Sequence, residues 1–339
     1  MYMKKIFLSL FLFLYAVYSP AQETVIVLGP GLKPAKGSET AFHEGLAHVV
    51  KEDKSGFIDT EGNIVIPCKY HAASDFSEGV ARVWQDGKCF FIDKSGKQAV
   101  PGKFDYAENF SDGLAMVQHG IKCGYIDKTG NLVVPYTYIE AGSFSDGLAM
   151  VGKDGKYGYI DKSGRVVIPF QYPQADDFHE GLACVEQNDK WGFIDKMGKD
   201  VIPFTFTLVS GFNEGLALYL DDRKCGFIDN SGETVIPNRY FSSRQFKDGL
   251  AAVLREKRWG FINKRGRQVI SCKYAESYDF SEGLVAVRRD SFWGYLDKRG
   301  NEVVPFKYLN ATSFSDGHAI VRSEDNWLII ENPLTSPLE

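Results

Sequence analysis

The chain has 339 residues, of which 44% are hydrophobic and 14% aromatic, with 39 Lys and Arg against 44 Asp and Glu. This composition is too apolar for a disordered protein, and the chain is too long for a small domain held together by disulfides. The net charge of -5 argues against a nucleic-acid-binding protein, because such a protein needs an excess of Lys and Arg to displace counterions from phosphates.

The first predicted element is a signal peptide over residues 1–21. Lys4 and Lys5 precede an apolar run that ends at Val17, and this run is too short to span a membrane. Ala21 provides a small residue at the predicted cleavage site. We therefore expect an exported protein, periplasmic or extracellular, with no membrane span after cleavage.

After an N-terminal segment of residues 22–41, a repeat with a period of 34 residues continues to residue 331, and residues 332–339 form a C-terminal tail. Nine Phe residues mark the period without insertion or deletion, and each is followed two residues later by Asp or Glu and then by Gly. This spacing predicts eight full units and a partial ninth. The marker residues are Phe42, Phe76, Phe110, Phe144, Phe178, Phe212, Phe246, Phe280 and Phe314.

One unit, residues 144–177, illustrates the predicted secondary structure. Residues 147–151 and 157–161 are apolar stretches on either side of a hairpin turn, and they predict two antiparallel strands. A third strand ends at Pro169, because proline cannot donate to a strand ladder. The unit is therefore predicted to be an all-β meander of three strands, with its marker Phe in the core.

A meander of this size cannot bury its apolar faces alone, so the units are expected to stack. Two architectures satisfy this requirement, an open superhelical β-array and a closed propeller-like ring. Propeller blades usually have four strands and number four to eight, so three strands in nine units favour the open array. The ninth unit lacks its third strand, however, and residues 24–28 are able to supply it and close a ring.

The repeated residues also carry a family resemblance. Trp191-Gly192-Phe193-Ile194-Asp195 illustrates one recurring motif, which follows Phe-x-acid-Gly-Leu-Ala and precedes Val-Ile-Pro. Over residues 42–331 this pattern resembles the WG-repeat, or KWG-repeat, family of bacterial proteins. The resemblance implies a tandem β-repeat protein, often secreted or associated with the envelope, whose role is mostly unassigned. The varying copy number of that family agrees with an open array. Four units have another residue at the position where the family pattern has Trp, namely Ser55, Cys89, Cys123 and Cys225.

No catalytic, metal or cofactor site is predicted. Each unit offers one acid after its Phe, whereas calcium needs six to eight oxygen ligands, so we expect these acids to cap their own turns. The Asp of each Asp-Lys-x-Gly segment is expected to begin a turn in the same way. The six Cys are expected to be buried thiols, because equivalent positions in stacked sheets lie about 10 Å apart. We therefore predict a non-enzymatic protein.

Two sets of residues are candidates for binding. A basic set in units seven and eight is expected to form one face for an anionic partner: Arg255, Lys257, Arg258, Lys264, Arg265, Arg267, Arg288, Arg289, Lys298 and Arg299. An aromatic set is expected to offer contacts to a glycan: Tyr157, Trp191, Trp259 and Trp293. The predicted function is a protein–protein interaction scaffold. The alternatives are an envelope-glycan-binding module and, less favoured, an enzyme with a site at one end of the array.

Overall fold

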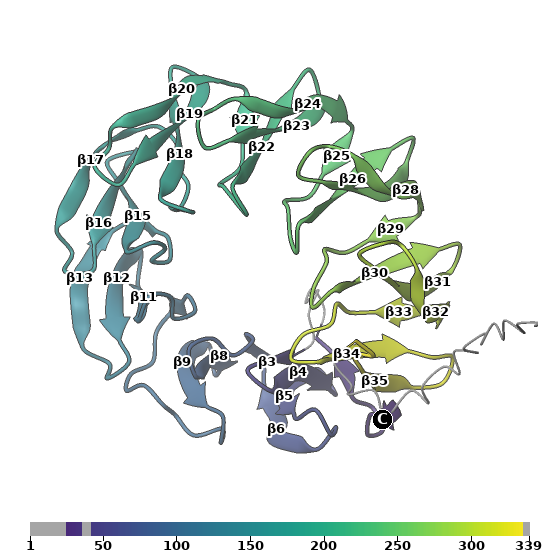
Figure 1. Cartoon of the computed structure of the whole chain (residues 1–339). Helices are drawn as coiled ribbons and strands as arrows, with labels where there is room; N and C mark the ends of the chain where they lie inside the picture. Colours follow the sequence, from purple (N-terminus) through teal and green to yellow (C-terminus); the bar gives the residue numbers. More distant parts are fainter. Residues whose placement is uncertain (1–24, 36–41, 335–339) are drawn as a thin grey trace, which may run out of the picture.

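The computed structural model describes residues 25–35 and 42–334, and the signal peptide predicted over residues 1–21 lies outside this part of the chain. All helix or strand structure in the described residues is β-strand, in nine sheets. Figure 1 shows these sheets arranged as the blades of a closed ring. The all-β tandem repeat and the closed-ring alternative are confirmed, and the open superhelical array is wrong. The protein is a nine-bladed β-propeller.

The strands follow the chain around the ring. Blade 1 contains β2 (Lys33–Pro34), β3 (Phe42–His43), β4 (Leu46–Lys51), β5 (Lys54–Ile58) and β6 (Ile64–Tyr70). Blade 2 contains β7 (Ala72–Ala73), β8 (Val80–Gln85) and β9 (Lys88–Asp93), and blade 3 contains β10 (Tyr106–Ala107), β11 (Leu114–His119), β12 (Lys122–Asp127) and β13 (Leu132–Tyr138). Blade 4 contains β14 (Glu140–Ala141), β15 (Leu148–Lys153), β16 (Lys156–Asp161) and β17 (Val166–Tyr172), and blade 5 contains β18 (Leu182–Gln187), β19 (Lys190–Asp195) and β20 (Asp200–Phe206).

The remaining blades continue in the same order. Blade 6 contains β21 (Leu208–Val209), β22 (Leu216–Asp221), β23 (Lys224–Asp229) and β24 (Thr234–Tyr240), and blade 7 contains β25 (Ser242–Ser243), β26 (Leu250–Arg255), β27 (Arg258–Asn263) and β28 (Gln268–Tyr274). Blade 8 contains β29 (Glu276–Ser277), β30 (Leu284–Arg289), β31 (Phe292–Asp297) and β32 (Glu302–Tyr308). Blade 9 contains β33 (Asn310–Ala311), β34 (His318–Arg322), β35 (Trp327–Glu331) and β1 (Val25–Val27).

A complete blade has four antiparallel strands, which we call a, b, c and d from the hub to the rim of the ring (Figure 1). In blade 4 these are β14, β15, β16 and β17. The sequence predicted three strands because strand a is only two residues long, which is too short to show an alternating pattern. Strand d forms the exposed rim of the blade. Pro169 has no N–H group, so it adds no unpaired donor to this sheet edge.

Strand β1 closes the ring by serving as strand d of blade 9. It pairs with β35 in antiparallel register, with Val25 opposite Ile330 and Val27 opposite Leu328. The chain then enters blade 1, where Leu28 is buried with residues of both terminal blades. This path from strand d of one blade to strand a of the next is the path taken at the other junctions. The N-terminal segment is therefore half of a repeat unit.

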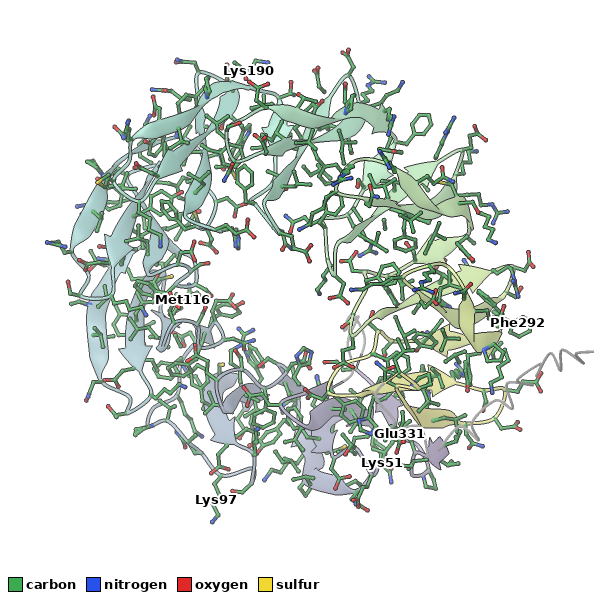
Figure 2. All side chains as sticks on the ribbon, in the orientation of Figure 1. Lys51, Lys97, Met116, Lys190, Phe292 and Glu331 are labelled. Carbon is green, nitrogen blue, oxygen red and sulfur yellow. The ribbon has the colours of Figure 1, made fainter. Side chains whose placement is uncertain are left out.

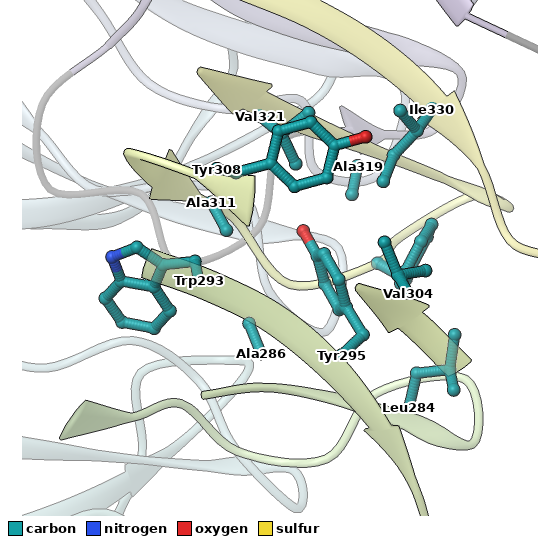
Figure 3. Packing of buried hydrophobic residues seen from close by; sticks show 11 residues of the cluster. Leu284, Ala286, Trp293, Tyr295, Val304, Tyr308, Ala311, Ala319, Val321 and Ile330 are labelled. Carbon is teal, nitrogen blue, oxygen red and sulfur yellow. The ribbon is translucent and has the colours of Figure 1, made fainter. Parts of the chain in front are cut away.

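The marker Phe side chains form the junctions between blades, as expected of core residues. Phe178 is fully buried, and its ring lies 4.8 Å from the ring of Tyr159 in strand c of the preceding blade. The same pairing recurs from Phe57 with Phe76 to Tyr295 with Phe314. Figure 3 shows such a junction between blades 8 and 9. Each hydrophobic cluster thus joins two neighbouring blades.

The Gly that follows the Trp position is required because strand d crosses close to strand c. A Cβ atom on Gly158 would lie 2.6 Å from the carbonyl oxygen of Ile168, and the strand pairing shifts register at this point. In the described chain, seven blades combine this Gly with a register shift. The two exceptions replace it. Blade 2 has Phe90 and no continuous strand d, and blade 9 has Leu328 and the unshifted β1.

We expect Gly158→Ala to destabilise the ring by about 1–3 kcal/mol, because the new methyl group must push the β17 backbone away from β16. The measurement is the free energy of unfolding by chemical denaturation. Gly155→Ala is the matched control, because no heavy atom lies within 4 Å of a Cβ at that position, although its positive φ adds some strain. Equal stability of wild type and Gly158→Ala would show that the close approach does not select glycine.

All six cysteines carry free thiols, in agreement with the expectation from their spacing. Four are buried, and Cys68 and Cys272 are half-buried. Burial raises the pKa of Cys89 to about 11. These side chains therefore act as small apolar residues of the blade junctions.

Candidate functional site

The antiparallel blades give the ring two different sides. Strands b and c meet in a hairpin at one end, where Lys153 pairs with Lys156, and the connections from strand d to the next strand a lie at this end too. The a–b and c–d turns lie at the other end, where Leu148 pairs with Asp161. We call these the hairpin side and the acid side. No described side chain crosses the middle of the ring in Figure 2.

The acid side carries a ring of nine carboxylates, one from each a–b turn. Each carboxylate accepts a hydrogen bond from the backbone N–H of the Gly in the next turn along the chain, over 2.6–3.3 Å. The ninth bond closes the circle, since Gly45 donates to Asp316. The acids are Glu44, Glu78, Asp112, Asp146, Glu180, Glu214, Asp248, Glu282 and Asp316. These bonds connect all nine blades.

This arrangement corrects the expectation that each acid caps its own turn. Asp146 and Gly147 both have positive φ, 53° and 85°, in a two-residue hairpin turn that Ser145 and Leu148 close with reciprocal backbone bonds. Asp146 is therefore free to direct its carboxylate to Gly181 of the next blade. Positive φ is unfavourable for a residue with a Cβ, and the bond between blades offsets that cost.

Lysines from the c–d turns of the following blade pair with five of the nine acids, at 3.0–3.9 Å. Lys94 illustrates the contact, because its ammonium group also donates to the carbonyl oxygen of Glu44 at 2.8 Å. Burial alone would raise the pKa of Glu44, but the hydrogen bonds from Gly79 and Lys94 outweigh it and hold this pKa below its ordinary value. The carboxylate is therefore charged at neutral pH.

Four acids have no ion pair in the described part of the chain, and they form two neighbouring couples. At Glu282 and Asp316 the chain covers the gap itself. Asn332 stands where other units have Lys, and its side chain donates to the carbonyl oxygen of Glu282 at 3.1 Å while its N–H donates to Gly317. Leu334 continues over this couple and packs beside Gly283.

The other couple, Asp146 and Glu180, borders an open depression of about 260 Å³. Asn230 occupies the Lys position opposite Glu180, whereas Lys196 occupies it opposite Asp146 but forms no ion pair with it in the described structure. In earlier turns, the residue before the acid is a Ser whose hydroxyl donates to the carbonyl oxygen of the next marker Phe, as Ser145 does to Phe178. His179 and Asn213 occupy this position beside the depression. Phe212 and Gln245 complete the lining. This is the part of the acid ring where two exposed carboxylates and the polar side chains of His179, Asn213 and Gln245 converge.

The Asp residues of the c–d turns have the expected role. Asp161 accepts from the N–H groups of Ser163 and Arg165, and the same pair of bonds recurs at the equivalent Asp of the other units. The bond from the Ser163 hydroxyl is the main cause that holds the pKa of Asp161 below its ordinary value. These carboxylates stabilise their turns.

The predicted basic set is not gathered on one face. Strands b, c and d place Arg255, Lys257, Arg258, Arg288 and Arg289 at the hairpin end of blades 7 and 8, and Lys264, Arg265, Arg267, Lys298 and Arg299 at the acid end. Strand c separates the two groups by about 17 Å. Lys264 and Lys298 also pair with Glu214 and Asp248. The density of Lys and Arg along the sequence could not show that consecutive turns lie on opposite sides of the ring.

The predicted aromatic set lies mainly within the blade junctions. Trp293 is 5% exposed and stacks on Tyr278 at 5.1 Å, as part of the cluster in Figure 3. Trp191 and Trp259 are half-buried against the clusters of their own junctions. Tyr157 is half-buried and donates its hydroxyl to Glu140. The structure therefore does not bring these rings together as one exposed surface.

Among residues 25–35 and 42–334, no three His, Cys, Asp or Glu side chains are grouped so as to hold a metal ion. The described residues also contain no helix that could cross a membrane.

Comparisons with known proteins agree with this architecture. The family model described as WG containing repeat matches residues 56–89, 90–123, 124–157, 157–191, 191–225, 226–258, 259–291 and 293–327. None of the curated protein sequences matches this chain.

Similarity to solved structures is similarity of fold at low sequence identity. The crystal structure of the eukaryotic initiation factor has a TM-score of 0.60 and 11% identity, and the match covers 84% of this chain and 93% of that one. BamB from Moraxella catarrhalis has a TM-score of 0.43 and 12% identity, over 94% and 99% of the two chains. The WD40 domain of SCAP from fission yeast has a TM-score of 0.37 and 10% identity, over 92% and 97%.

Proposed function

Because this chain belongs to the family of WG-containing repeat proteins, with repeats that span residues 56–327, we propose that it is an exported, non-enzymatic scaffold for protein–protein interaction. Its predicted signal peptide supports export. Its ring supports a scaffold role, because a regular array of blades presents a large, rigid surface on which unphased residues provide recognition. We place the partner-binding site at Asp146 and Glu180 on the acid side.

The observation that carries this proposal is the segment of residues 332–334. It lies on the acid side over Glu282 and Asp316, where it replaces a missing lysine with the amide of Asn332. Asp146 and Glu180 are exposed, have no ion pair within the described residues and border the depression of about 260 Å³. A segment of a partner protein can therefore lie on the acid side of blades 4–6, in the way that the chain's own segment lies on the acid side of blades 8 and 9.

The chemistry of the depression selects a partner segment with a cationic side chain. In five other turns the acid takes a lysine ammonium group, so the geometry of Asp146 and Glu180 is already that of an ammonium-binding site. Asn213 and Gln245 offer donors and acceptors for a peptide backbone. A Lys or Arg within an extended peptide segment matches these groups.

The test compares proteins captured from envelope extract by wild type and by the double variant Asp146→Asn, Glu180→Gln. The amide oxygens still accept from Gly181 and Gly215, so we expect the ring to fold while a captured partner is reduced at least about tenfold. A photo-crosslinking amino acid at Asn213 identifies the protein that contacts the depression.

The matched control is Glu44→Gln, Glu78→Gln, which changes two acids that already pair with lysines. This control should retain the partner. The proposal fails if the site variant and the control capture the same proteins as wild type, or if no protein crosslinks at Asn213.

A further inference from the structure

The hairpin side carries large apolar side chains at one repeated position of the connections between blades, whereas the exposed apolar side chains of the acid side, Met197 and Leu334, lie at two different positions. At six of the d–a connections in the described chain, the N–H of one residue donates to the end of strand b. At three junctions this residue is apolar and exposed, and we call these three the link residues: Ile139 (59% exposed), Phe241 (63%) and Leu309 (42%). Their N–H groups donate to Gly152, Leu254 and Arg322 respectively.

The link residues share one side of the ring but not one patch. They occupy the same position of the repeat, at the junctions of blades 3 and 4, 6 and 7, and 8 and 9. They are therefore spread around the ring, and three such points define a plane. Ile121, which is 74% exposed, and Phe292, which is 40% exposed, project from hairpins on the same side. Figure 2 shows Phe292 at the outer edge of the ring.

Cations accompany these apolar side chains. The residue that begins strand c at the hairpin is an exposed Lys or Arg in six successive blades, namely Lys88, Lys122, Lys156, Lys190, Lys224 and Arg258. The hairpins next to two link residues have net positive charge, since Lys153-Asp154-Gly155-Lys156 sums to +1 and Arg255-Glu256-Lys257-Arg258 to +2. Glu324 and Asp325 lie in the hairpin of blade 9, next to Leu309, and acids neutralise the hairpin cations of blades 2, 5 and 6, so the net positive charge lies in blades 3, 4 and 7.

One junction shows the combination directly. Ile139, Lys153 and Lys156 line a shallow depression of about 330 Å³, together with the carboxylates of Glu140 and Asp154. The Glu140 carboxylate accepts from the Tyr157 hydroxyl, and the apolar side chain of Ile139 shares this depression with two ammonium groups. This arrangement fits the boundary of a bilayer, where anionic headgroups lie above acyl chains.

We propose that the hairpin side docks on an anionic phospholipid surface, with the link residues inserted at the headgroup level and the hairpin cations against the headgroups. Separate apolar points, two of them beside a hairpin of net positive charge, match an extended bilayer better than one protein partner, which would need a continuous apolar contact. The nine carboxylates of the acid side are repelled by the same surface, so the protein has one orientation on it.

The test is flotation of the chain from Gln22, which includes every strand of the ring, with vesicles of phosphatidylglycerol and phosphatidylcholine or of phosphatidylcholine alone. We expect binding to the anionic vesicles only, reduced at about 1 M salt. The variant Ile139→Ser, Phe241→Ser, Leu309→Ser should lose at least about tenfold of the bound fraction. These side chains are exposed, so the variant should keep the melting temperature of wild type.

The matched control is Val166→Ser, Val201→Ser, Val235→Ser, which removes three similarly exposed side chains from the rim strands. This variant should bind like wild type. The proposal is overturned if wild type does not float with anionic vesicles, if it floats equally with both lipids, or if both triple variants behave alike. Loss of a captured protein by the link-residue variant, without vesicle binding by wild type, would assign this side to a protein partner instead.

Discussion

Removal of residues 22–28 should destabilise the ring by about 3–6 kcal/mol, because the deletion takes away strand β1 and two side chains, Ile26 and Leu28, that pack at the junction of blades 9 and 1. We expect strand β35 to lose its outer neighbour and its amides to exchange rapidly with solvent. Hydrogen exchange at Ile329 and Ile330, together with the radius of gyration, measures the opening.

Point variants within β1 give a matched pair for this experiment. Ile26 faces the junction beside Gly62, whereas Val27 is 57% exposed. Ile26→Asp should therefore reproduce much of the deletion, because it places an unpaired charge in an apolar junction, and Val27→Asp should have little effect. Equal melting temperatures for the deletion and wild type would mean that β1 does not hold the ring closed.

Phe178→Ala should cost about 3–5 kcal/mol, the range for truncation of a fully buried aromatic side chain. The side chain joins blade 4 to blade 5, where it meets Tyr159, Ile168 and Val185. Its loss leaves a cavity at one junction, and a closed ring has no free end through which the neighbouring blades can relax. The free energy of unfolding by chemical denaturation is the measurement.

Arg265→Glu is the control for Phe178→Ala. Arg265 is exposed in a c–d turn, where its backbone N–H, and not its side chain, donates to Asn263. The substitution should change stability by less than about 0.5 kcal/mol. An unchanged melting temperature for Phe178→Ala would contradict the assignment of the marker Phe residues to the core.

The sequence predicted the strands of a blade much better than the shape of the whole array. Alternation of apolar residues, turns at Gly and the end of a strand at Pro169 all arise within one unit, so they are visible in one unit. Closure depends instead on the rotation between neighbouring blades, which side-chain packing at each junction determines. The local evidence for a ring was the missing strand of the ninth unit and the apolar residues around Ile26.

The candidate site was harder to predict than the fold. A carboxylate such as that of Asp146 lies next to its own turn in sequence, so capping of that turn is the simplest interpretation. Its actual acceptor role, toward Gly181, joins residues 35 apart and depends on the distance between blades. The open couple at Asp146 and Glu180 was nevertheless visible in part, because Asn230 interrupts the series of lysines.

The antiparallel pairing of β1 with β35 has a mechanical consequence. Val25 lies opposite Ile330, so the chain that precedes β1 and the chain that follows β35 leave the ring at the same end of this short ladder. Tension between them would first load the bonds of Asn332 and would then peel the backbone pairs apart one after another, instead of shearing them all at once. A ring that nine blade junctions hold closed can thus be opened at one junction by a small force between these two chain segments.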